Sequence, residues 1–126
     1  MSRVCELRLD EPLQLDSERL ADMFVELGEA QATHLIALSI DRLEGLVEEV
    51  ERAVTQMRAG DCVEHAGEIR ALGDALGLLS LSNAASGVTL AVQSSDEVAV
   101  AATLARLQRM ALRSFRIAEE LQHRSG

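Results

Sequence analysis

The clearest pattern in the chain is an apolar residue at every third or fourth position between residues 29 and 58. Because an α-helix turns once in about 3.6 residues, side chains at this spacing lie along one face. The pattern predicts a long helix from Glu29 to about Arg58, with its apolar stripe turned toward a core. The stripe has seven members: Ile36, Ile40, Leu43, Val47, Val50, Val54 and Met57.

A shorter helix is predicted before this one, and another directly after it. Asp16 carries a side chain that suits a helix N-terminus, and the short helix that follows it is expected to end at Gly28. Asp61 is expected to cap the next helix, which should run from about Cys62 to Gly77. Both predictions rest on the same physical need, because the first amide groups of a helix have no partner inside it.

Two further helices complete the predicted bundle. One spans about residues 81–92, and Ser94 with Glu97 reads as a capping box before the last helix. The fold class expected is all-α, an antiparallel four-helix bundle with a short leading helix, formed by residues 16–126 as one domain. The apolar seam of the last helix consists of Val100, Leu104, Leu107, Ala111, Ala118 and Leu121.

The N-terminal residues follow a different period. In residues 3–9, Cys5, Leu7 and Leu9 alternate with polar neighbours, and Leu13 and Leu15 continue the rhythm after Pro12. A period of two is typical of a half-buried β-strand. Residues 1–15 are therefore predicted to form a strand, a hairpin or an extended arm lying on the bundle.

Composition supports helices and narrows the classes of partner. Aromatic residues make up 2% of the 126 residues, and the formal net charge is −9. Nucleic-acid binding is disfavoured, because it depends on cations that neutralise phosphates and on aromatic rings that stack on bases. No apolar run reaches the length of a membrane span, and the two cysteines fit no redox or metal motif. A cytoplasmic protein without membrane contact is expected.

Residues that could support catalysis or hold a metal are sparse. The three histidines lie far apart in the sequence, and neither a zinc-protease motif nor a glycine-rich phosphate loop is present. The sequence therefore predicts no metal, no cofactor and no enzymatic activity.

The stretch from His65 to Ala85, rich in glycine and alanine, contains a more informative motif. It resembles the histidine-containing phosphotransfer (HPt) domains of bacterial phosphorelays, four-helix bundles whose central helix carries approximately A-H-x-L-K-G-x-x-x-x-L-G-A. When Leu76-Gly77 is aligned with the end of that motif, Ile69 falls on the apolar position, Arg70 on the basic one and Ala71 on the small one. Leu81, Ala84 and Val88 match the family's next helix, and Gly60-Asp61 matches a pair that precedes the motif.

One departure from the family pattern decides the function expected. In this register the phospho-accepting histidine is replaced by Gly67, and His65 lies two residues too early. Two residues rotate a helical side chain by about 200°, which turns His65 toward the face shared by Ile69 and Leu72. The resemblance thus implies the fold of an HPt domain without its phospho-acceptor.

The function expected is a signalling module that binds a receiver domain or a histidine kinase without carrying phosphate. Its partner-binding strip on the central helix would comprise Gly67, Glu68, Arg70, Ala71 and Asp74, with affinity from an apolar patch near residues 72–79. Two alternatives stay open. His65 could be an active phospho-acceptor, or the chain could be a structural or dimerising bundle, in which the N-terminal strand and the Ala/Gly-rich helix mediate homodimer formation.

A stripe of four arginines on the last helix also invites an interpretation. Arg106, Arg109, Arg113 and Arg116 recur at helical spacing, and an acidic partner could bind them. The simpler expectation is a solvated face, or pairing with the acidic stripe of the long helix, Glu44, Glu48 and Glu51.

Overall fold

The structure is a computed structural model that describes residues 11–125, and the side-chain surroundings of residues 11–120. Within residues 11–125 the chain forms helices and no β-strand, which confirms the all-α class. The predicted strand over residues 3–9 lies outside the described part. Leu13 and Leu15, which continue its alternation, belong to an extended segment that forms no strand. The helices are α2 (Ser17–Leu27), α3 (Glu29–Thr55), α4 (Ala59–Leu76), α5 (Leu79–Gln93) and α6 (Glu97–Ser125).

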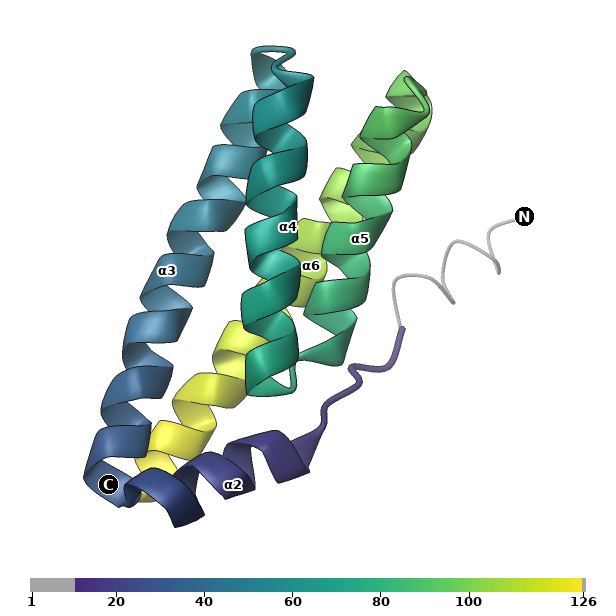
Figure 1. The fold of residues 1–126 in the computed structure, drawn as a ribbon. Coiled ribbons are helices and arrows are strands. Elements are labelled where there is room, and N and C mark those ends of the chain that lie inside the picture. Colours follow the sequence, from purple (N-terminus) through teal and green to yellow (C-terminus); the bar gives the residue numbers. More distant parts are fainter. Residues whose placement is uncertain (1–10, 126) are drawn as a thin grey trace.

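Four long helices lie side by side as a bundle, and the short helix α2 crosses one end of it (Figure 1). The turn between α4 and α5 lies at the same end as α2, whereas the turns after α3 and α5 lie at the other end. Each long helix contacts two others, in the cyclic order α3, α4, α5, α6. None of the helices within the described residues is long and apolar enough to cross a membrane.

The core between the long helices is aliphatic. The predicted stripe of α3 is buried from Ile36 to Val50, and Val54 is half-buried. Met57 was expected to extend this stripe, and that prediction is wrong, because 83% of the residue is exposed. The helix ends at Thr55, and Met57 has a backbone φ of +57°, so its side chain no longer follows the helical phase. Buried residues from the other helices complete the core, among them Ile69, Leu81, Leu107 and Met110.

The predicted helix start at Asp16 is confirmed, and the one at Asp61 is wrong. Asp16 Oδ1 accepts a hydrogen bond from the amide of Glu18 at 3.2 Å, and α2 begins at the next residue. The helix α4 instead begins at Ala59, so Asp61 lies inside its first turn. There its carboxylate forms an ion pair with Arg58 at 2.9 Å and is placed favourably near the positive end of the helix dipole.

The predicted capping box before the last helix is also wrong. Asp96 supplies the cap, because its Oδ1 accepts a hydrogen bond from the amide of Ala99 at 3.1 Å. The hydroxyl of Ser94 instead donates to the carbonyl of Ala91 at 3.0 Å, in the last turn of α5. Asp and Ser are nearly equivalent as caps, so the sequence alone did not distinguish them.

Close packing of α4 against α5 explains some of the small residues between His65 and Ala85. Ala66, Ala84 and Ala85 are buried, and a Cβ atom on Gly73 would lie 2.6 Å from the hydroxyl oxygen of Ser82. That hydroxyl donates to the carbonyl of Arg70 across the interface at 3.2 Å. Several of the small residues in this stretch therefore serve helix packing within this chain.

Gly77 follows the last residue of α4 and contacts the residue that precedes α2. It has φ +75°, a left-handed conformation that L-residues with a side chain rarely adopt. The amide of Asp16 donates to its carbonyl at 2.8 Å, and a Cβ atom on Gly77 would lie 2.3 Å from the carbonyl oxygen of Asp16. Only glycine fits this position without displacing the chain.

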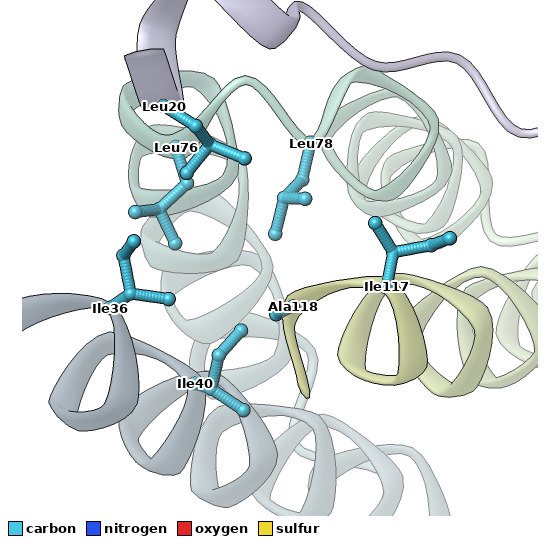
Figure 2. A pocket seen from close by; sticks show the side chains of 7 residues that line it. All are labelled: Leu20, Ile36, Ile40, Leu76, Leu78, Ile117 and Ala118. Carbon is cyan, nitrogen blue, oxygen red and sulfur yellow. The ribbon is translucent and has the colours of Figure 1, made fainter. Parts of the chain in front are cut away.

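Helix α2 closes its end of the bundle by apolar packing. Leu20 of α2 points toward side chains of α3, α4 and α6 around a small void (Figure 2). Because every lining side chain is aliphatic, this void offers no polar group to orient a ligand. The lining residues are Leu20, Ile36, Ile40, Leu76, Leu78, Ile117 and Ala118.

Candidate functional site

The strip predicted on the central helix lies on the C-terminal half of α4. Gly67, Arg70, Ala71 and Asp74 are all exposed, whereas Glu68 is half-buried. Spacings of three and four residues place the four exposed positions along one side of the helix. The strip therefore offers small residues and charges of both signs to solvent on a rigid element.

Glu68 is held by a neighbouring helix. Its Oε2 accepts a hydrogen bond from Nη2 of Arg42, on α3, at 2.6 Å. Sequence reasoning did not connect Arg42 with the strip, because the two residues lie 26 positions apart on different helices. The pair is partly exposed and fixes one edge of the strip against α3.

His65 is half-buried on α4. Only 25% of its side chain is exposed, and Nδ1 is buried without a hydrogen-bond partner among the described residues. The nearest carboxylate oxygen, Oε1 of Glu68, is 4.0 Å from Nδ1, which is too long for a hydrogen bond. Within the described chain, no carboxylate or carbonyl thus accepts a hydrogen bond from Nδ1.

Gly67, by contrast, has space around it. Apart from its chain neighbours and the backbone of its own helix, no atom lies within 4 Å of the position that a Cβ would take, and the residue is exposed. Neither packing nor backbone conformation requires glycine here, unlike at Gly73 and Gly77. A side chain at position 67 would project from α4 into solvent.

The prediction of an apolar surface patch near residues 72–79 is largely wrong. Leu76 and Leu78 are 3% and 2% exposed, because they face the core, while Leu72 and Leu79 are half-buried. What the surface offers beside the strip is a shallow depression between α3 and α4. It is lined by Arg42, Leu46, Glu68, Ala71, Leu72 and Ala75.

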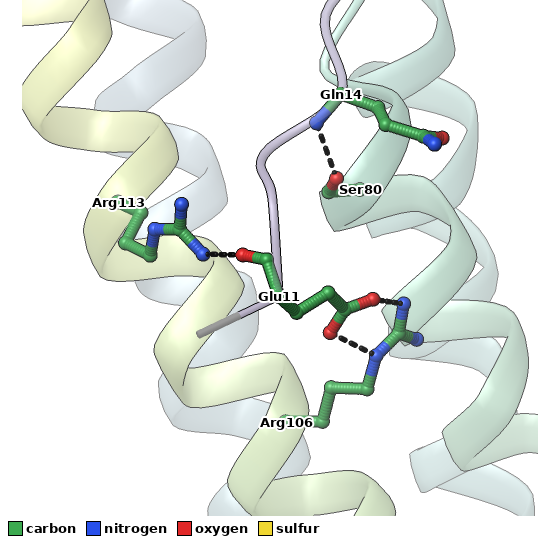
Figure 3. A network of polar contacts seen from close by, with 5 residues as sticks. All are labelled: Glu11, Gln14, Ser80, Arg106 and Arg113. Carbon is green, nitrogen blue, oxygen red and sulfur yellow. Dashed lines mark hydrogen bonds and ion pairs between the residues drawn. The ribbon is translucent and has the colours of Figure 1, made fainter. Parts of the chain in front are cut away.

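A second polar cluster joins the N-terminal segment to α6 (Figure 3). Both carboxylate oxygens of Glu11 accept hydrogen bonds from Arg106, from Nε at 3.0 Å and from Nη2 at 2.6 Å. The guanidinium of Arg113 donates to the backbone carbonyl of Glu11. The arginine stripe was expected to be solvated or to pair with the acidic residues of α3. Its partner among the described residues is Glu11, because residues 11–16 lie against α5 and α6.

Backbone hydrogen bonds hold this segment, which we call the arm (residues 11–16), on the bundle. The amide of Gln14 donates to the hydroxyl of Ser80 at 2.7 Å, and the amide of Ser80 donates to the carbonyl of Gln14 at 3.2 Å (Figure 3). Leu13 and Leu15 pack against the core. Apolar side chains and backbone hydrogen bonds therefore both attach the arm to the bundle.

The attachment of the arm should weaken in acid. The hydrogen bonds from Arg106, opposed in part by burial and reinforced by the charges of Arg106, Arg109 and Arg113, lower the pKa of Glu11 below its ordinary value. A carboxyl with a lowered pKa in the folded state stabilises that state above its ordinary pKa. This contribution is lost as the pH falls through the lowered value. The difference in unfolding free energy between wild type and Glu11→Gln should be largest near neutral pH and vanish in acid, measured by urea titration at several pH values. A difference that does not change with pH would contradict the assignment.

The described residues contain no cluster of metal ligands, and their free cysteine is buried. Within residues 11–125, no group of three or more His, Cys, Asp and Glu side chains lies close enough to hold a metal ion. Cys62 is buried, and burial raises the pKa of its thiol, which disfavours the reactive thiolate.

No protein-family model matches this chain, and neither the curated proteins nor the solved structures contain a match to it.

Proposed function

We propose that this chain is an HPt-like signalling module that binds a receiver domain or a histidine kinase in the cytoplasm without carrying phosphate. In this proposal α3 to α6 correspond to the antiparallel four-helix bundle of the family, and α2 to its short leading helix. The module has no catalytic role. It acts by occupying the surface that its partner presents to a phosphotransfer protein.

The observation that carries this proposal is the exposed strip on α4. The resemblance assigns Gly67 to the position of the phospho-acceptor, and Arg70 and Ala71 to the basic and small positions three and four residues later. All three are exposed on one side of α4, together with Asp74. The small side chains at positions 67 and 71 would allow a partner to approach the helix backbone, while Arg70 and Asp74 would fix its orientation.

The absence of phosphate transfer in this proposal rests on His65 and Gly67 together. Glycine has no nucleophilic side chain, and the imidazole of His65 is half-buried with its Nδ1 shielded from solvent. A docking surface that keeps its shape without an acceptor would compete with active phosphotransfer proteins for the same receiver.

The proposal is tested by titrating this protein into purified receiver domains encoded by the same genome and measuring the heat of binding by calorimetry. We expect at least one receiver to bind, and we expect Arg70→Glu or Gly67→Arg to weaken that binding about tenfold or more, which corresponds to 1.4 kcal/mol. The first variant reverses a charge on the strip, and the second fills the space that a partner helix would need.

The matched control is Arg116→Glu, which makes the same charge reversal at an exposed position of α6. This variant should bind as wild type does. Equal weakening by Arg70→Glu and Arg116→Glu would show that only net charge matters and would overturn the docking strip. Failure of every receiver domain to bind, and of every histidine kinase domain titrated in the same way, would overturn the proposed function as a whole.

A further inference from the structure

The arginines around Glu11 form a second candidate site, separate from α4. Arg106, Arg109 and Arg113 are spaced by three and four residues, so they lie on one face of α6, and all three are half-buried. The formal net charge of the whole protein is −9. These three neighbouring cations form a positively charged patch on a protein that is acidic as a whole.

One carboxylate does not satisfy these three guanidinium groups. Both oxygens of Glu11 accept from Arg106, and Arg113 donates to the backbone carbonyl of Glu11. Nε of Arg109 is buried and has no hydrogen-bond partner among the described residues. The cluster therefore carries three positive charges against one negative charge, and it contains a donor that Glu11 does not reach.

The donors of this cluster match a ligand with more oxygens and more charge than a carboxylate has. A phosphate group carries a charge of about −1.5 to −2 at neutral pH and offers at least three acceptor oxygens. Arginine binds phosphate with the same two-pronged geometry that Arg106 uses here with Glu11. A tetrahedral dianion would thus give each arginine its own acceptor.

We propose that Arg106, Arg109 and Arg113 form a binding site for a phosphate dianion, either inorganic phosphate or a small phosphomonoester, and that Glu11 occupies this site as an internal competitor. The ligand would take the place of the Glu11 carboxylate. The backbone hydrogen bonds at Gln14 and Asp16 do not involve that carboxylate, so the base of the arm can stay attached while Glu11 leaves.

The test is calorimetric titration of the full-length protein at low salt and about pH 7.5, where a phosphomonoester is a dianion. The ligands are inorganic phosphate, O-phosphoserine and, as a monoanionic carboxylate, acetate. We expect both phosphate ligands to bind more tightly than acetate. Tighter binding of phosphoserine than of inorganic phosphate would assign the site to monoesters, and the reverse order would assign it to the free ion.

Variants separate this site from general electrostatic attraction. Glu11→Gln should bind phosphate roughly tenfold more tightly, because removing an internal competitor raises the fraction of molecules whose site is free. Glu26→Gln removes the same charge from an exposed position of α2 and should bind as wild type does. Because the expected result is a gain, loss of folding does not imitate it.

The arginines are tested in the Glu11→Gln background. Arg109→Gln should abolish the gain, whereas Arg116→Gln, at the exposed end of the stripe, should retain it. Equal affinities of wild type and Glu11→Gln, or an equal gain in Glu26→Gln, would overturn the proposal. Retention of full affinity by Arg109→Gln would overturn it as well. None of these results depends on whether a receiver domain binds α4.

Discussion

Replacing Gly77 with alanine is expected to lower the free energy of unfolding by about 2 to 4 kcal/mol. Part of this cost is the left-handed backbone conformation, which is worth roughly 1–2 kcal/mol for a residue with a side chain. The rest comes from the new Cβ atom, because its position lies 2.3 Å from the carbonyl oxygen of Asp16. The start of α2 would have to move away, and the hydrogen bond from the amide of Asp16 to the carbonyl of Gly77 would be strained or lost.

The matched control is the same substitution ten residues earlier, inside α4. Gly67→Ala places a methyl group in open space in a helix interior, so it should stabilise the protein by about 0.5–1 kcal/mol. Urea denaturation followed by circular dichroism measures both effects. If the two substitutions shift the transition in the same direction, the role assigned to Gly77 is wrong.

Replacing Gly67 with histidine is expected to convert a chain that carries no phosphate into one that accepts it. Under the proposed function, Gly67 holds the position of the missing acceptor, and a Cβ atom there would point into open space. A solvent-exposed imidazole is largely neutral near pH 7 and can attack an aspartyl phosphate. Incubation with a phosphorylated receiver domain should give acid-labile, base-stable label on Gly67→His and none on wild type.

Two variants make this result specific. Gly45→His places a histidine at another exposed glycine with open space, on α3, and should stay unlabelled. The double variant Gly67→His with His65→Ala should label as fully as Gly67→His alone. Label on wild type that disappears in His65→Ala would contradict the proposal and support a relay through His65.

Helical phase predicted much of this fold, because buried faces depend on a simple repeat. The stripe from Ile36 to Val50 is buried, and the exposure of Gly67, Arg70 and Asp74 agrees with their predicted phase. Helix ends were predicted less well, since several neighbouring residues can cap a helix and the choice among them depends on the turn. Ser94 and Asp96 illustrate this, and so does the loss of Met57 from its stripe after a turn with positive φ.

The attachment of the arm could not be predicted from local pattern. Glu11 and Arg106 are 95 residues apart, and no periodicity connects them. Alternation of apolar residues predicted an extended segment, but it did not show which helices this segment would cross. The shielding of His65 was predicted from its phase. The contact of Glu68 with Arg42 depends on how α3 and α4 pack.

The cyclic order of the helices determines whether the two proposed sites, on α4 and on α6, can be occupied at the same time. The backbones of α4 and α6 both lie beside those of α3 and α5, and within the described residues they do not lie beside each other. They therefore occupy diagonally opposite corners of the bundle. A macromolecule docked on the strip of α4 and an oxyanion bound by α6 would not compete for space.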